Sequence, residues 1–105
     1  MPESAAIFGV GEIVHHNRFD YRGVIVDVDP EFDMDEEWYE KMAKGRPPKD
    51  RPWYHVLVHD AVHMTYVAER NLRHVEDPEP IRHPMIEEYF ESFSAGRYRP
   101  MVALN

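Results

Sequence analysis

The chain has 105 residues, a net charge of −8 and no cysteine. A length of this order fits one domain that buries its own core, and the absence of cysteine excludes disulfides, thiolate zinc sites and thiol nucleophiles. The acidic balance repels phosphate at long range, so it argues against strong non-specific binding to DNA.

Targeting and membrane segments are not expected. The first eleven residues carry an acid, Glu3, where a signal peptide carries bases, and their apolar run is short. No apolar stretch of the sequence approaches the roughly 18 residues of a membrane helix. We therefore expect a soluble, cytoplasmic protein with no membrane partner.

The first half of the chain has the pattern of β-strands. Residues 11–16 form a β-prone run, residues 18–23 resemble a turn, and residues 24–28 alternate apolar side chains at Val24, Val26 and Val28. This alternation is the period of a strand with one buried face. The pair Asp29-Pro30 ends the strand, because proline donates no hydrogen bond to a sheet.

Residues 31–52 form a long insertion with a helical centre. Asp33 is the expected N-cap and Glu36 its partner in a capping box. Gly45 is suited to end this helix. Three prolines between residues 46 and 52 predict an extended segment after it.

Strands resume at residues 53–59 and 63–67, followed by a 3₁₀-like turn at residues 68–72 and a short strand at residues 73–75. After a linker at residues 77–80, Pro84 occupies a favoured first position of a helix. Gly96 ends that helix, and residues 97–105 are expected to be a mobile tail. The apolar stripe of the expected helix consists of Met85, Ile86, Tyr89, Phe90 and Phe93.

Five short strands with local connections predict a mostly β fold, a five-stranded SH3-like barrel that removes its own edges. Residues 1–7 are then an N-terminal segment, residues 8–76 the barrel with its insertion, and residues 77–96 the linker and a C-terminal helix. If the stripe of that helix exceeds what the barrel covers, a second copy covers the rest in a homo-oligomer. Otherwise the helix closes its own barrel and the protein is a monomer.

Charge is distributed in two consecutive blocks. Residues 27–40 contain eight carboxylates and no base, and residues 41–51 contain five bases and one acid, Asp50. The basic block is more typical of a solvated loop than of a ligand site. It is nevertheless the one cluster suited to meet phosphate or an acidic partner.

Four motifs in order resemble a known family. They are Phe8-x-Val10-Gly11-x-x-Val14-x-His16, Tyr21-Arg22-Gly23-Val24-Ile25-Val26-Asp27-x-Asp29-Pro30, Pro52-Trp53-Tyr54-His55-Val56-Leu57-Val58 and Thr65-Tyr66-Val67-Ala68-Glu69-x-Asn71-Leu72. Over residues 8–90 the sequence resembles the hemimethylated-DNA-binding, YccV-like domain family, whose small stand-alone members are HspQ-type heat-shock proteins.

The resemblance implies an SH3-like barrel and two alternative functions. The first is a role in heat-stress proteolysis, as a substrate and specificity-enhancing factor of the Lon protease. The second is binding to hemimethylated origin DNA, with an effect on expression of the replication initiator. The net charge and the many aromatic residues favour a protein partner. Three asparagines and no glutamine are few side chains to identify a methylated adenine in the major groove.

Metal and catalytic patterns are weak, and we predict neither a cofactor nor an enzyme. Residues 29–40 place acids in the register of a calcium loop, but Met34 stands where that loop needs glycine. His55, His59 and His63 could approach one another across a hairpin, yet their spacing matches no known zinc module. Gly9-Val10-Gly11 lacks the third glycine of a dinucleotide loop.

Partner contacts are expected from three groups of residues. Core packing accounts for most of the aromatic residues, and those left exposed near the proline-rich insertion would form a binding face. The C-terminal residues Tyr98, Met101, Val102 and Leu104 are expected to engage a protease. The candidates for contact with a protein or nucleic acid are Lys41, Lys44, Arg46, Lys49, Arg51, Trp53, Tyr21, Arg22 and Tyr98.

Overall fold

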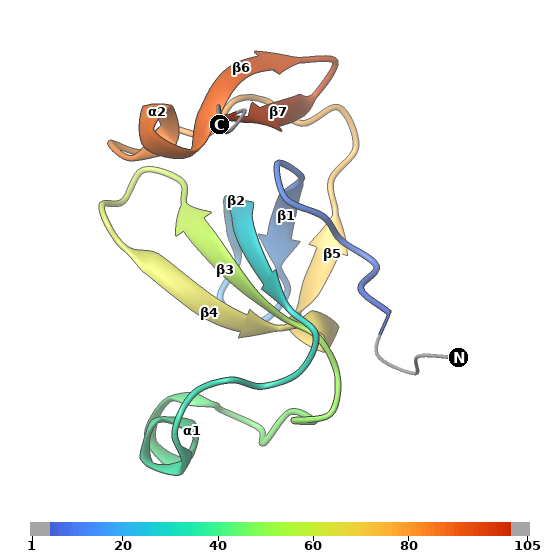
Figure 1. Ribbon diagram of the computed structural model, residues 1–105, viewed down its shortest axis with the longest axis vertical. Helices are drawn as coiled ribbons and strands as arrows, with labels where there is room; N and C mark the ends of the chain where they lie inside the picture. Colours follow the sequence, from blue (N-terminus) through green and yellow to red (C-terminus); the bar gives the residue numbers. More distant parts are fainter. Residues whose placement is uncertain (1–4, 102–105) are drawn as a thin grey trace, which may run out of the picture.

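A computed structural model describes residues 5–101, which form a mostly β fold. Five antiparallel strands make the main sheet, in the order β4-β3-β2-β1-β5 (Figure 1). They are β1 (Ile13–His16), β2 (Tyr21–Asp29), β3 (Trp53–Val58), β4 (Met64–Ala68) and β5 (Leu72–His74). A 3₁₀ turn, η1 (Glu69–Asn71), joins β4 to β5. All five predicted strands and the predicted 3₁₀ turn are therefore confirmed, with bounds that differ by a few residues.

Both faces of the main sheet are buried. Neighbouring residues in a strand point to opposite sides, so one strand contributes to the apolar cluster on each face. Val56 belongs to one apolar cluster together with Val14 and Ile25. The next residue, Leu57, belongs to another cluster that continues into the C-terminal segment. A bulge lies in β2 between Ile25 and Asp27. Strands that are buried on both faces have longer apolar runs than strands with one solvent-exposed face.

The sheet does not close into a barrel, so that part of the fold prediction is wrong. Within residues 5–101, β4 and β5 stand at opposite ends of the strand order and do not pair with each other. The sheet curves around one apolar cluster, and the C-terminal segment covers its other face (Figure 1). Covering by a separate layer removes the need for closure, and it leaves two sheet edges.

The predicted C-terminal helix is also largely wrong. One helical turn, α2 (Ile86–Tyr89), is followed by a hairpin of β6 (Phe90–Ser94) and β7 (Arg97–Pro100). Ala95 and Gly96 both have positive φ, 53° and 76°, which is the geometry of a two-residue hairpin turn. The expected mobile tail is therefore a strand up to Pro100, while Val102 and Leu104 lie outside the described residues.

The apolar residues of the expected stripe still face inward. Phe90 is buried together with Ile81 and Tyr98, and the other four pack partly buried against the same cluster. The Tyr98 hydroxyl accepts a hydrogen bond from the Ile81 amide at 2.8 Å. The C-terminal segment thus covers one face of its own sheet with these residues.

The insertion contains α1 (Glu36–Met42), whose N-cap is Asp35 and not Asp33. The Asp33 amide instead donates to the Tyr66 hydroxyl at 2.9 Å. Tyr39 buries its ring, and its hydroxyl donates to the Pro47 carbonyl at 2.6 Å. This bond connects the helix to the extended proline segment. No helix in the described part of the chain is long and apolar enough to span a membrane.

Candidate binding groove

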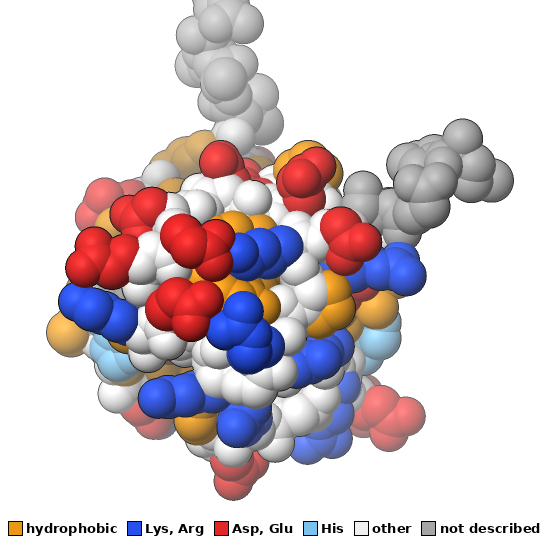
Figure 2. Space-filling model, turned by 90° about the horizontal axis from the view of Figure 1, so that it is seen from below, with side chains coloured by type: hydrophobic (Ala, Val, Ile, Leu, Met, Phe, Trp, Pro, Cys, Tyr) orange, Lys and Arg blue, Asp and Glu red, His pale blue; other side chains and the backbone are white. Residues whose placement is uncertain are grey.

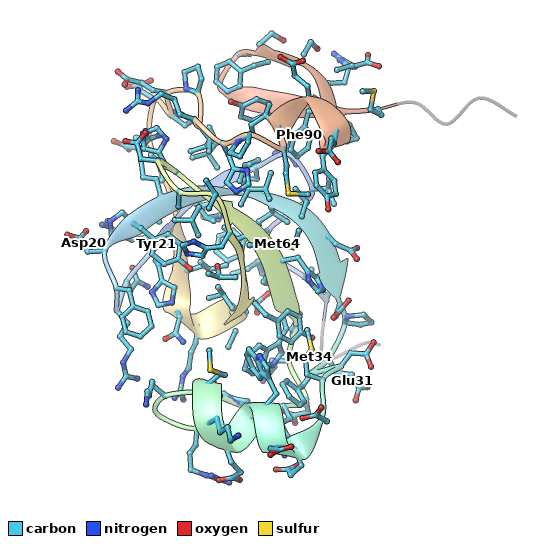
Figure 3. The ribbon with its side chains drawn as sticks, turned by 90° about the vertical axis from the view of Figure 1, so that its left-hand side faces the viewer. Asp20, Tyr21, Glu31, Met34, Met64 and Phe90 are labelled. Atoms are coloured by element: carbon cyan, nitrogen blue, oxygen red, sulfur yellow. The ribbon has the colours of Figure 1, made fainter. Side chains whose placement is uncertain are left out.

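A groove of about 490 Å³ follows β4 and is walled by the β1–β2 turn and by the insertion. Figure 3 looks onto this side of the molecule, with Tyr21 and Met64 at the level of the sheet and Met34 beside α1. The lining is mainly aromatic residues, methionines and histidines. It consists of His16, Phe19, Tyr21, Met34, Trp38, Met42, His55, His63, Met64, Thr65, Tyr66 and Val67.

His16 builds the first wall by fixing the β1–β2 turn. Its Nδ1 accepts hydrogen bonds from the amides of Arg18 and Phe19, both at 3.1 Å. Its ring lies 4.8 Å from that of Phe19 and 5.0 Å from that of Tyr21. Burial, followed by the neighbouring charges of His15 and Arg18, lowers the pKa of His16. A neutral imidazole, which keeps Nδ1 free to accept, therefore holds Phe19 in place.

The insertion supplies the second wall. The Asp35 carboxylate accepts a hydrogen bond from the Trp38 amide at 2.7 Å and so fixes the first turn of α1. The Trp38 ring packs edge-on against Tyr66 with 5.5 Å between centroids. Met34 precedes this turn and Met42 ends the helix, so the two methionines flank the tryptophan along the groove.

Tyr66 of β4 connects the wall to the sheet. Its ring stacks on Trp53 at 5.2 Å, and its hydroxyl donates to Asp29 at 2.6 Å while accepting from the Asp33 amide. Burial, together with the hydrogen bond to the Asp29 carboxylate, raises the pKa of Tyr66 well above its ordinary value. The phenol therefore stays protonated and keeps the insertion attached to the sheet edge.

Exposed apolar side chains gather at this groove. Seven large hydrophobic side chains are exposed within residues 5–101, and four of them line it. Those four are Phe19 at 59%, Met34 at 42%, Met42 at 59% and Met64 at 37%. A contiguous apolar surface rimmed by polar residues marks a binding site more often than scattered exposed residues do.

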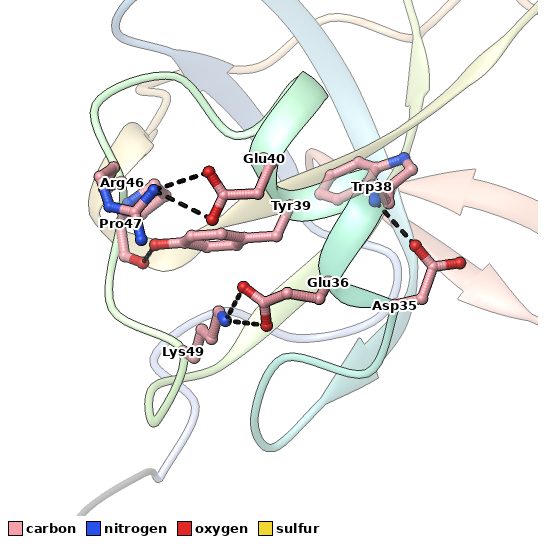
Figure 4. A network of polar contacts seen from close by, with 8 residues as sticks. All are labelled: Asp35, Glu36, Trp38, Tyr39, Glu40, Arg46, Pro47 and Lys49. Carbon is pink, nitrogen blue, oxygen red and sulfur yellow. Dashed lines mark hydrogen bonds and ion pairs between the residues drawn. The ribbon is translucent and has the colours of Figure 1, made fainter.

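Three of the five bases in the predicted cluster pair with the acidic block before it, and Figure 4 shows the pairs of Arg46 and Lys49. Viewed from below in Figure 2, acidic and basic side chains lie next to one another on this face. The pairs are Lys49 with Glu36 at 2.6 Å, Arg46 with Glu40 at 3.0 Å and Lys41 with Glu37 at 3.4 Å. Lys49 also lies 4.2 Å from the centre of the Tyr39 ring. Three of the five expected phosphate ligands thus already have anionic partners.

The remaining predicted contact residues divide into buried and accessible ones. Trp53 and Tyr98 are buried, at 1% and 5% exposed, because both rings fill apolar clusters. Arg22 is half-buried and donates to the Glu79 carbonyl at 3.0 Å, which fixes the linker. Tyr21 lines the groove, and its hydroxyl is 2.7 Å from that of Thr65. Arg51 is exposed and lies outside the groove lining.

Two cations stand at one end of the groove. Arg18 and Lys44 line a smaller hollow that adjoins it at the Ala68 end of β4. Both side chains are exposed, and among residues 5–101 neither has an ion-pair partner. Lys44 was among the predicted contacts, whereas Arg18 was missed because it belongs to neither charge block.

Potential metal ligands are found together at one place on the sheet. Oxygen atoms of Asp27 and Asp29 and a ring nitrogen of His55 lie within 4.8 Å of one another. Asp29 already accepts the Tyr66 hydroxyl, and its Oδ2 lies 3.2 Å from His55 Nε2. These hydrogen bonds to other protein groups are sufficient to explain the positions of Asp29 and His55.

Sequence reasoning missed most of the groove. Phe19, Met34, Met42 and Met64 come from three separate segments and share no spacing in the sequence. One usable signal was Phe19, an aromatic residue between two charged ones inside a predicted turn. Such a residue has no strand or helix face on which to be buried.

Comparison with known families agrees with the motifs. The model of the family described as hemimethylated DNA-binding protein YccV-like matches residues 6–97. The match includes the main sheet, the insertion and most of the C-terminal hairpin. The chain therefore belongs to the YccV-like family, which is a family of binding domains.

Proposed function

We propose that this protein is a non-catalytic binding module that recognises an apolar segment of a partner protein in the groove along β4. In the HspQ-like role, the module is a substrate and specificity-enhancing factor of a Lon-type protease in stress proteolysis. The observation that carries the proposal is the gathering of four exposed apolar side chains at one groove.

The chemistry of the groove suits a protein segment. Methionine side chains are flexible and polarizable, so Met34, Met42 and Met64 can adapt to different apolar side chains. Phe19 and Trp38 offer aromatic surface of the kind that dominates protein interfaces. A volume of about 490 Å³ lies within the range of about 300–1,000 Å³ that is usual for ligand sites.

A degradation assay with purified Lon tests this function. We expect the protein to be degraded by Lon, or to change the turnover of a second Lon substrate. The double variant Phe19→Ser/Met42→Ser should lose the effect. The matched control Ile7→Ser/Val62→Ser removes two apolar residues that are at least as exposed, at 61% and 78%, and that lie outside the groove, so it should keep the effect. An unchanged assay with wild-type protein, or equal loss in both variants, would contradict the proposal.

A second candidate function is binding to hemimethylated DNA. The family description names it, and the exposed Arg18 and Lys44 beside the aromatic groove favour it. The test is a titration of hemimethylated and fully methylated duplexes at near-physiological salt, with Arg18→Gln/Lys44→Gln as the variant. Preference for the hemimethylated duplex that the variant loses would support this function. Equal, weak and salt-labile binding to both duplexes would reject it.

A further inference from the structure

The backbone of β4 has an unpaired edge inside the groove. β4 is the last strand of the sheet order and pairs with β3 alone. Four consecutive residues of this strand, 64–67, line the groove. Because consecutive side chains point to opposite faces, a hollow lined by all four lies along the strand edge and not over one face.

The alternation of hydrogen-bonded pairs between β3 and β4 shows which backbone groups of β4 are available to an added strand. The Val58 amide donates to the His63 carbonyl, and the Glu69 amide donates to the Pro52 carbonyl. Both bonds follow the register of β3 and β4, in which hydrogen-bonded and non-hydrogen-bonded pairs alternate. The amides and carbonyls of Met64 and Tyr66 therefore point away from β3, and no partner is seen for them among residues 5–101.

The two edges of the sheet differ in how they are protected. The opposite edge, β5, has three residues and carries the exposed Arg73 and His74, which is how soluble proteins prevent edge pairing. β4 has five residues and contains no charged residue and no proline. An unprotected edge beside exposed apolar side chains is suited to accept a further strand.

We infer that the groove binds an extended apolar segment of a partner protein as an added strand, antiparallel to β4. The inference rests on the proposed function and specifies its mode of recognition. Amides and carbonyls of the segment would pair with those of Met64 and Tyr66, while its apolar side chains contact the two walls. Arg18 and Lys44 stand at the Ala68 end, so the segment carries an acidic residue toward its amino end.

A second copy of the chain is a poorer occupant of the same edge. Symmetric pairing of β4 with β4 would bring the partner's turn and α1 to the place where this copy's turn and α1 already wall the groove. An occupant of this edge must therefore fit between these walls. A partner segment without folded neighbours, such as an unfolded region, meets this requirement.

The test uses a fluorescent nonapeptide with an amino-terminal aspartate followed by alternating leucine and threonine. Two derivatives are N-methylated at alternate positions, so that each blocks the amides of one edge of the peptide. Only one edge can face β4, so one derivative should bind at least tenfold more weakly while the other stays within about threefold of the parent peptide.

Variants of the protein provide a second, independent readout. Met64→Pro removes an amide that points away from β3, at the first residue of the strand, where proline is tolerated. It should weaken peptide binding about threefold to tenfold more than Met64→Ala, which removes the same side chain and keeps the amide. Thermal unfolding and near-ultraviolet circular dichroism verify that both variants are folded.

Three results would overturn strand addition. Equal binding of both methylated peptides would mean that side chains alone are recognised, in which case the proposed function stands. A dimer in sedimentation that Met64→Pro dissociates would identify a second copy as the occupant. Failure of the wild-type protein to bind the parent peptide at millimolar concentration would also overturn it, while the Lon assay judges the proposed function separately.

Discussion

Removing charge from α1 tests whether the acidic block restrains the basic block. Each glutamate of the helix holds one base, in the pairs Glu36–Lys49, Glu37–Lys41 and Glu40–Arg46. The triple replacement of these glutamates by glutamine keeps the side-chain size and frees three cations. The net charge changes from −8 to −5, since three negative charges are lost. We expect the triple variant to gain non-specific, salt-dependent DNA binding.

The size of this gain follows from the number of cations released. Each cation that neutralises a phosphate contributes about 0.9 to the slope of log affinity against log salt, so three contribute up to about 2.7. Between 200 mM and 50 mM salt, a slope of this size strengthens binding by up to about 40-fold. The wild-type protein should show a correspondingly flatter dependence.

Fluorescence anisotropy with a labelled duplex at several salt concentrations measures both slopes. The matched control is the triple variant Glu87→Gln/Glu88→Gln/Glu91→Gln, which makes the same change in net charge at exposed positions of α2 and β6. It should bind DNA much less than the α1 variant. Equal slopes in the two variants would show that net charge alone is responsible, and would refute local restraint of the bases.

Three further predictions concern the supports of the groove. Tyr39→Phe leaves the Pro47 carbonyl without its buried donor, so the free energy of unfolding should fall by about 1–3 kcal/mol, measured by urea denaturation. Gly23→Ala places a Cβ 2.6 Å from the Leu57 carbonyl oxygen, so the melting temperature should fall by several degrees or the protein should not fold. Because the pKa of His16 is lowered in the folded state, the unfolded chain binds more protons below about pH 6.5. Stability should therefore decline as the pH falls below 6.5, by at most about 1.4 kcal/mol per pH unit for this group, and His16→Asn should flatten that decline; an unchanged profile would contradict the role of His16.

The strands of the main sheet were predictable because their signals are local. Alternating apolar residues identify β2, Pro30 marks its end, and Pro52 marks the start of β3. Closure into a barrel was not predictable in this way. It depends on whether the two outer strands meet, and no feature within either strand specifies this.

The C-terminal hairpin was missed because its apolar residues fit two periods. Met85, Ile86, Tyr89 and Phe93 have the spacing of a helix face, while Phe93 and Tyr98 also face each other across a two-residue turn. The turn has Ala95 in the left-handed region, where asparagine or aspartate is the stronger signal. Packing on the main sheet decides between the two structures, and that packing is not visible in the local sequence.

The helix start in the insertion shows how two equivalent signals compete. Asp33 and Asp35 both precede a helical pattern and both can cap it. In the fold, the Asp33 amide donates to the Tyr66 hydroxyl of β4, the helix has not yet begun at Asp33, and Asp35 is the cap. The tertiary contact that selects the cap also sets the position of Trp38 in the groove wall.

Substitution of exposed groove residues should weaken binding without lowering the stability of the fold. Phe19 and Met42 are each 59% exposed, so water already contacts most of their surface in the folded protein. Replacing both with serine should therefore change the free energy of unfolding by about 1 kcal/mol or less, in the range of ordinary surface substitutions. A residue kept for packing behaves in the opposite way, because its removal from the core costs about 2–5 kcal/mol. Loss of binding with retained stability in Phe19→Ser/Met42→Ser would therefore show that these side chains serve recognition and not the fold.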